Sequence, residues 1–111
     1  MTTTRRTLIA ATALAALPGV ATAQETFPSR PITLVVPWPA GGSTDVLARI
    51  LAQTMQPMFG QPVIVENRGG ASGTVGHAHV ARSRPDGYTL LLATNSTYAI
   101  APHLMASLPY E

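Results

Sequence analysis

Short apolar runs separated by polar and glycine-rich segments dominate the hydrophobic pattern of the chain. Residues 32–36 read Ile-Thr-Leu-Val-Val, residues 63–65 read Val-Ile-Val, and residues 88–93 read Tyr-Thr-Leu-Leu-Leu-Ala. Short runs that are rich in β-branched residues and bounded by proline or glycine are typical of strands buried in a parallel sheet. The pattern therefore predicts a strand at each of these places.

An amphipathic helix is predicted between the first and second strands. Apolar residues recur there at i, i+3 and i+4 spacing, which predicts a helix of about four turns. Ser43 or Thr44 is expected to cap this helix, and Phe59-Gly60 is expected to end it. Its apolar positions are Val46, Leu47, Ile50, Leu51, Thr54, Met55 and Met58.

The rest of the chain completes an alternating pattern. A second helix is predicted over residues 75–82, and one or two helical turns are predicted over 98–104, where Pro102 interrupts them. The order β-α-β-α-β has connections long enough for neighbouring strands to pair in parallel. The sequence therefore predicts an α/β fold built on a parallel sheet.

A polar loop follows the carboxyl end of each predicted strand. Ligands of open parallel sheets bind beyond these ends, and two of the loops also open helices, whose free N–H groups attract anions. Neither loop tip has a basic residue, so a carboxylate held by backbone amides and hydroxyls is the simplest chemistry that fits. The alternative is that these residues only form turns and caps.

The candidate ligand-binding residues therefore lie in three loops. They are Trp38, Ala40, Gly41, Gly42, Ser43, Thr44 and Asp45 in the first loop, Ala71, Ser72, Gly73 and Thr74 in the second, and Thr94, Asn95 and Ser96 in the third. Asp45 is also expected to act as a favourable negative charge in the first turn of its helix.

The N-terminus has the order of a secretory signal, which we assign to residues 1–23. Arg5 and Arg6 precede an apolar run over residues 8–17, and Ala21-Thr22-Ala23 predicts cleavage before Gln24. The apolar run is shorter than the ~20 residues of a membrane-spanning helix. The paired arginines also resemble a twin-arginine signal, so export by either Sec or Tat fits this pattern.

The net charge of +2 disappears when the predicted signal is removed. Residues 24–111 contain five Arg, two Asp and three Glu, with no Lys and no Cys. This composition has no basic run and no set of stacking aromatic residues, which argues against a nucleic-acid partner. A domain without disulfides must instead be stabilised by its core.

The sequence has no recognisable catalytic, cofactor or metal motif. The segment from Gly70 to Gly76 departs from the dinucleotide fingerprint at Ser72, and the chain has no lysine for a phosphate-binding loop. His77 and His79 are two residues apart, so they point to different sides of a helix and form no ligand pair. They are expected to lie at the surface or to be partly packed.

Four blocks of the chain resemble the Bug family, the receptors of tripartite tricarboxylate transporters. Residues 31–49 read PITLVVPWPAGGSTDVLAR, and residues 61–76 read QPVIVENRGGASGTVG. Residues 85–92 read PDGYTLLL, and residues 108–111 read LPYE. The blocks occur in the family order and cover nearly all of the chain after the predicted signal.

The resemblance implies a periplasmic solute-binding receptor rather than an enzyme. It implies a monomer without a cofactor or metal that delivers small carboxylates or related solutes to the subunits of a membrane transporter. It places the ligand carboxylate on backbone groups and bridging waters at Ala40, Gly41, Gly42 and Ser43, and at Ala71, Ser72 and Gly73. Residues 24–111 would then form part of the N-terminal lobe, the first domain of a type II periplasmic-binding-protein fold.

Members of this family continue well beyond the position of Glu111, so the chain is expected to be a truncated portion with half of a ligand cleft. Two alternatives stay open at this stage. One is a non-functional remnant of such a receptor that binds weakly or not at all, and the other is an α/β enzyme.

Overall fold

The computed structural model describes residues 25–110, so the predicted signal over residues 1–23 and its cleavage site lie outside the described residues. The elements in chain order are β1 (Ile32–Val36), α1 (Ser43–Phe59), β2 (Val63–Asn67), η1 (Ala71–Gly73), α2 (Thr74–Ala81), β3 (Thr89–Leu91), η2 (Ser96–Ile100) and α3 (Ala101–Leu104).

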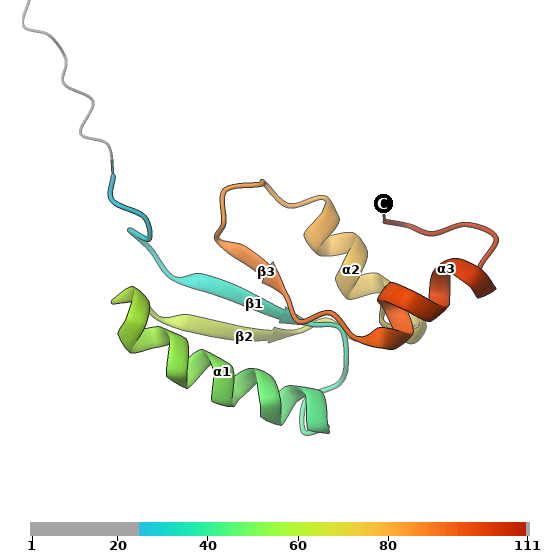
Figure 1. Ribbon diagram of the computed structural model, residues 1–111, viewed down its shortest axis with the longest axis horizontal. Helices are drawn as coiled ribbons and strands as arrows, with labels where there is room; N and C mark the ends of the chain where they lie inside the picture. Colours follow the sequence, from blue (N-terminus) through green and yellow to red (C-terminus); the bar gives the residue numbers. More distant parts are fainter. Residues whose placement is uncertain (1–24, 111) are drawn as a thin grey trace, which may run out of the picture.

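The strands form a parallel sheet in the order β2-β1-β3, with β1 in the centre (Figure 1). Leu34 of β1 is aligned with Val65 of β2 on one side and with Leu90 of β3 on the other. The predicted β-α-β-α-β order and the parallel pairing are therefore confirmed. The parallel arrangement also brings the carboxyl ends of all three strands to the same edge.

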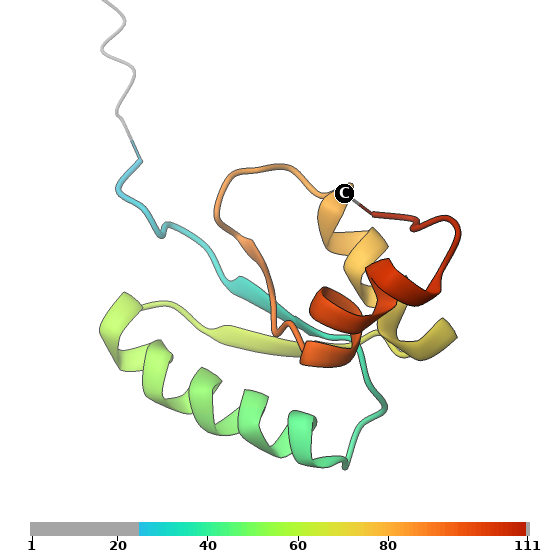
Figure 2. The same ribbon diagram turned by 45° about the vertical axis from the view of Figure 1, so that its right-hand side comes forward.

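Helices cover the two faces of the sheet, α1 on one face and α2 on the other (Figures 1 and 2). The core under α1 contains alternate residues of the central strand, Ile32, Leu34 and Val36, packed with Ala48 and Ala52. Alternate residues of a strand point to the same face, so β1 supplies one complete apolar row to this layer.

The apolar positions predicted for α1 are mostly exposed. Val46, Leu47, Ile50, Leu51 and Met58 are all more than a third exposed, and Met58 reaches 77%. The buried positions that face the sheet are the two alanines of the core and Asp45 at the start of the helix, and of the predicted apolar positions Met55 packs against this core. Small side chains let the helix backbone lie close to the strands, which leaves the longer apolar side chains on the outer surface.

The two ends of α1 differ in how well the sequence predicted their capping residues. The prediction that Ser43 or Thr44 caps the helix is wrong, because Gly42 occupies the N-cap position and no side chain makes the capping hydrogen bond. The predicted end is confirmed, since Gly60 adopts a left-handed conformation with φ of 65° and donates its N–H to the Gln56 carbonyl at 3.0 Å.

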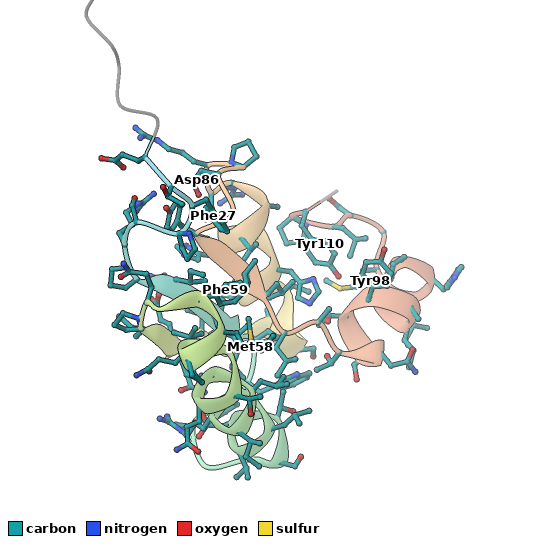
Figure 3. The ribbon with its side chains drawn as sticks, turned by 60° about the vertical axis from the view of Figure 1, so that its left-hand side comes forward. Phe27, Met58, Phe59, Asp86, Tyr98 and Tyr110 are labelled. Carbon is teal, nitrogen blue, oxygen red and sulfur yellow. The ribbon has the colours of Figure 1, made fainter. Side chains whose placement is uncertain are left out.

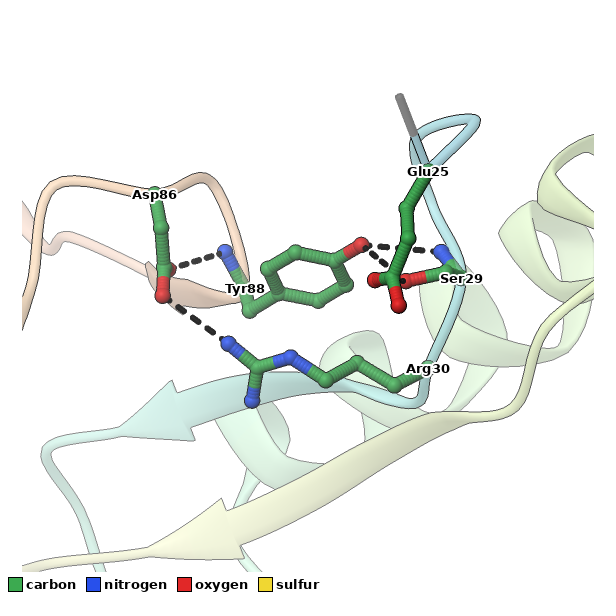
Figure 4. A network of polar contacts seen from close by, with 5 residues as sticks. All are labelled: Glu25, Ser29, Arg30, Asp86 and Tyr88. Atoms are coloured by element: carbon green, nitrogen blue, oxygen red, sulfur yellow. Dashed lines mark hydrogen bonds and ion pairs between the residues drawn. The ribbon is translucent and has the colours of Figure 1, made fainter. Parts of the chain in front are cut away.

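A cluster of polar and aromatic contacts ties the segment before β1 to the turn before β3 (Figure 4). The Arg30 guanidinium lies 2.9 Å from the Asp86 carboxylate and 4.0 Å from the centre of the Tyr88 ring. The Ser29 N–H donates to the Tyr88 hydroxyl at 2.8 Å, and the Phe27 ring packs edge-on against Tyr88. These contacts close the amino end of the sheet, opposite the loops.

Helix α2 lies against the loop that follows β1 because Gly76 has no side chain. A Cβ atom at this position would be 2.8 Å from Pro37 Cβ and 2.9 Å from the Arg68 carbonyl oxygen. Between residues 25 and 110, no helix has both the length and the hydropathy needed to cross a membrane.

We expect Gly76→Ala to destabilise the fold, although alanine is the better helix former by about 1 kcal/mol. The added methyl group would displace backbone atoms on two neighbouring segments, and such overpacking costs roughly 1–3 kcal/mol. The measurement is the free energy of unfolding by urea denaturation. Val75→Ala, at the exposed neighbouring position, is the control and should change it by about 0.5 kcal/mol at most. A Gly76→Ala variant as stable as the control would contradict the packing described here.

Candidate functional site

The three predicted loops meet at the carboxyl edge of the sheet, on the right in Figure 1. The loop after β1 presents an exposed tip from Ala40 to Ser43, and the loop after β2 presents Ala71 and Ser72. The loop after β3 presents Asn95 and Ser96. The fold thus gathers backbone and hydroxyl groups from distant parts of the sequence at one end of the domain.

The Asp45 carboxylate organises the loop after β1. Its Oδ2 accepts hydrogen bonds from the Gly41 N–H at 2.9 Å and from Arg49 Nε at 3.0 Å, and its Oδ1 accepts one from Asn67 Nδ2 at 3.0 Å. The same Asn67 nitrogen donates to the Trp38 carbonyl oxygen at 3.2 Å. Asp45 is only 3% exposed. The carboxylate is therefore occupied by internal partners, and its place in the structure is that of a support for the loop.

These hydrogen bonds favour the charged form of Asp45. The Arg49 guanidinium contributes most, followed by the Gly41 N–H and the Asn67 amide, and together they lower the pKa of the Asp45 carboxyl from 3.8 to about 2. Asp45 therefore stays ionised across the physiological range. The guanidinium of Arg49 is in turn engaged with a carboxylate inside the protein.

The indole of Trp38 connects the first loop to the third. Its Nε1 donates to Thr94 Oγ1 at 3.2 Å, and a Cβ atom on Gly73 would lie only 2.5 Å from the Thr97 methyl and 3.4 Å from the Trp38 ring. Gly73 also has a φ of 89°, a conformation that side chains rarely adopt. One residue of the second loop is therefore locked between the other two loops.

The network continues from the third loop to a buried histidine. Thr97 Oγ1 lies 2.5 Å from His77 Nε2, and the Tyr110 hydroxyl donates to the Thr97 carbonyl. The ring of Tyr110 lies 4.8 Å from the imidazole of His77, where the C-terminal segment folds back over α2 (Figure 3). His77 is 4% exposed, so the expectation of a surface or partly packed histidine is wrong for this residue.

The loop after β2 has an unusual backbone. Ala71 and Ser72 have φ values of 45° and 57°, and they lie between Gly70 at 132° and Gly73 at 89°. The Gly73 N–H donates to the Gly70 carbonyl at 2.9 Å and closes this turn. Non-glycine residues in the left-handed region carry strain that often accompanies binding sites. The strain here falls on two of the predicted ligand-binding residues.

Ser72 and Ser96 line the same hollow, of about 360 Å³, together with Ile100, Ala101, Leu104 and Met105. The fold thus joins the second and third predicted loops directly. The first loop is joined to the third through Trp38 and Thr94. The side chains of Trp38 and Thr94 are half-buried, and Thr44 is half-buried as well.

Two arginines near this edge are each paired with a carboxylate, and their side chains are partly exposed. Arg49 is paired with Asp45, and Arg68, at the end of β2, pairs with Glu66 at 2.5 Å. Among residues 25–110, every buried side-chain nitrogen or oxygen has a hydrogen-bond partner. The N–H groups of Gly42 and Ser43 donate to no acceptor within these residues. The described part of the chain has no cluster of three or more side chains suited to a metal ion.

Sequence reasoning missed several residues that build this edge. Asn67 and Thr97 hold the loops together. Asn67 is the last residue of β2, and Thr97 belongs to the polar run after β3, so a polar residue at or after the carboxyl end of a strand is the signal that could have identified them. The apolar wall of the hollow, from Ile100 to Met105, had no such signal. Its position opposite Ser72 depends on the way the third loop packs on the second.

Comparison with known proteins places the chain among solute receptors. The family profile described as tripartite tricarboxylate transporter family receptor matches residues 47–111. Protein BugT of Bordetella pertussis is 53% identical over 88 residues, covering 78% of this chain and 27% of that protein. A UPF0065 protein of Bordetella bronchiseptica is 47% identical over 106 residues, covering 96% of this chain and 32% of that protein. The chain therefore spans about a third or less of the length of these relatives.

Solved structures support the same assignment. A periplasmic transporter superposes with a TM-score of 0.75 at 48% identity, covering 78% of this chain and 29% of that chain. A protein of R. palustris with adipate has a TM-score of 0.74 at 36% identity over the same shares. MatC of Rhodopseudomonas palustris with bound malate has a TM-score of 0.57 at 46% identity, covering 59% of this chain and 22% of that chain.

We expect Asp45 to make the fold sensitive to strong acid. A carboxyl whose pKa is lower in the folded state than in the unfolded state stabilises the fold at pH values above 3.8, and this contribution is lost as the pH falls toward about 2. The free energy of unfolding should therefore fall less steeply with decreasing pH between 3.8 and about 2 in Asp45→Asn than in the original protein. That variant should also be less stable at neutral pH. Gln53→Ala, exposed on the same helix, should follow the original curve. An Asp45→Asn curve that matches the original protein in the acid range would refute the role of this carboxylate.

His77 should produce a second, separate pH dependence. Burial lowers the pKa of His77 below 6.5, so the folded state binds fewer protons than the unfolded state. The free energy of unfolding should decrease as the pH falls below 6.5, and His77→Gln should remove most of this decrease. The measurement is chemical denaturation at pH values on either side of 6.5, with the exposed His103→Gln as the matched control. Equal pH dependence in both variants would show that His77 is not responsible.

Proposed function

Because the chain belongs to the tripartite tricarboxylate transporter receptor family, we propose that it binds the carboxylate of a small organic acid outside the cytoplasmic membrane. In this proposal it hands the acid to the subunits of a membrane transporter. The observation that carries the proposal is the convergence of three loops, with exposed neutral donors, at the carboxyl edge of the sheet.

The first part of the site is the start of α1. The N–H groups of Gly42 and Ser43 precede a helix of 17 residues, so the helix dipole reinforces their attraction for an anion. The Asp45 carboxylate holds the Gly41 N–H and fixes the loop before a ligand arrives. Such preorganisation reduces the entropy that binding has to overcome. The ligand carboxylate would then replace water on groups that are already in place.

The second part of the site is the hollow shared by the second and third loops. Ser72 and Ser96 supply hydroxyl groups that can donate to a carboxylate, and the hydrogen bond from the Gly73 N–H to the Gly70 carbonyl closes the turn that carries Ser72. Thr94 and Asn95 stand beside them in the chain. The acids found with similar proteins, adipate and malate, both have two carboxylates, which supports a small carboxylic acid as the ligand class.

The family consists of receptors rather than enzymes, and several of its relatives are periplasmic binding proteins. We accordingly propose a periplasmic location for this chain, with the segment over residues 1–23 acting as the export signal and residues 24–111 as part of the N-terminal lobe. We also propose that the protein acts as a monomer. The chain spans at most about a third of the length of these relatives.

One alternative has an observation in its favour. The outer side of α1 exposes several large apolar residues, and the sheet has only three strands in the described residues. A chain in this state could be a remnant that folds without binding its ligand strongly. Ligand binding separates this alternative from the receptor.

We expect dicarboxylates to raise the melting temperature of the 111-residue chain in a concentration-dependent way. A ligand at one hundred times its Kd stabilises the folded state by about 2.7 kcal/mol. Gly42→Pro should abolish the shift, because proline removes the N–H donor while the φ of −77° at this residue suits a proline ring. The measurement is a thermal-shift titration with malate and adipate.

Gln53→Ala, on the exposed side of α1, is the control and should keep the full shift. A shift that persists in Gly42→Pro would place the carboxylate away from the first loop. A melting transition that neither acid moves in the original protein would favour the remnant.

A further inference from the structure

We propose that the apolar wall formed by Ile100, Leu104 and Met105 selects acids with an extended apolar carbon chain over short hydroxylated acids. The inference rests on the proposed function, since it describes how the same site would treat the part of the ligand beyond its carboxylate. It assigns a specificity role to three residues that follow the third loop.

The geometry of the hollow separates polar from apolar groups. Ser72 comes from η1 and Ser96 from the start of η2, and they supply the hydroxyl groups of the lining. The remaining lining residues, Ile100, Ala101, Leu104 and Met105, are all apolar. The volume of about 360 Å³ falls in the range of sites for small molecules. A ligand bound to the two hydroxyls would extend along this wall.

The backbone places the wall side chains for contact rather than for burial in the core. Ile100 and Leu104 are four residues apart, so they share one side of the helical segment. They are 45% and 79% exposed, and Met105, 39% exposed, continues the wall where the chain becomes extended. The segment η2 is a π-helical turn, a rare geometry that is frequent at functional sites.

The backbone is unusual on the opposite side of the hollow as well. Ser72 is one of the two non-glycine residues with positive φ among residues 25–110. Two independent departures from regular backbone geometry therefore border the same hollow. Ordinary surface loops do not require either of them.

The chemistry of the lining explains why acids with an extended apolar chain are preferred over short hydroxylated acids. None of the six lining residues is charged, so the carboxylate gains only neutral hydrogen bonds, and further affinity has to come from burying carbon atoms. A hydroxyl group on the ligand chain would lose its water against leucine and methionine without gaining a partner, which is unfavourable. Acids with several methylene groups bury carbon atoms against the wall, whereas short hydroxy acids have few carbon atoms to bury there.

The test is a calorimetric titration of the 111-residue chain with unbranched monocarboxylates from acetate to octanoate, and with tartrate. We expect the Kd to decrease about fourfold for each added methylene until the hollow is full, which is the gain for burying one methylene. Tartrate should bind no more tightly than acetate. A wild-type series in which all the acids bind with similar Kd would overturn the inference while leaving carboxylate binding intact.

Substitutions distinguish the wall from the carboxylate site. Leu104→Gln and Ile100→Thr should each reduce the dependence on chain length and leave the acetate Kd unchanged. Ser72→Ala should weaken every acid by a similar factor and preserve the dependence on length. Leu47→Gln is the matched control, because Leu47 is equally apolar and 50% exposed but lies on α1.

Two results would count against the wall. If both wall variants keep the original dependence on chain length, another surface contacts the carbon chain. If Leu47→Gln reduces the dependence as strongly as Leu104→Gln, the effect is one of general surface hydrophobicity. Should acetate and octanoate both fail to bind while adipate still raises the melting temperature, the inference falls and the proposed function stands. Should adipate and malate also fail, the proposed function falls, and the inference falls with it.

Discussion

The hydrogen bonds of the Asp45 carboxylate are the interactions on which the loop end of this domain depends. The carboxylate stands in the first turn of α1, but its partners belong to the loop before the helix, the next helical turn and the end of β2. Burying a charge is costly unless it is paired and hydrogen-bonded, and here each oxygen has a donor. The domain therefore uses its buried negative charge to hold the loop in place.

The three loops combine a buried network of side-chain contacts with exposed hydrogen-bond donors on their surface. Trp38, Gly73, Thr94 and Thr97 interlock the three loops through contacts that leave little room for adjustment. Exposed backbone amides and serine hydroxyls lie beside these contacts on the surface of the loops.

Much of the architecture could be predicted from the sequence, because it depends on local patterns. The bounds of β1, the glycine that ends α1 and the β-α-β-α-β order all follow from apolar runs and punctuating glycines. The family could also be identified from four short motifs, and the profile match over residues 47–111 confirms it. Side-chain orientation was harder to predict. The buried residues on the inward side of α1 are the small Ala48 and Ala52, and of its larger apolar residues only some, such as Met55, pack against the same core.

The parts of the site that could not be predicted all depend on contacts between distant residues. His77 is buried because Tyr110, far along the chain, covers it. The hollow exists because the segment after β3 packs beside the strained loop after β2. In each case a tertiary contact outweighs the local preference that the sequence displays.

The cluster around Tyr88 has a practical consequence for work with this protein. It fixes residues 27–30 against the amino edge of the sheet, at the pole opposite the loops (Figure 4). A linker joined to Glu25 would leave the domain on that side. The chain could therefore be tethered to a sensor chip or a resin through this segment, and the loops would stay open to the surrounding solution.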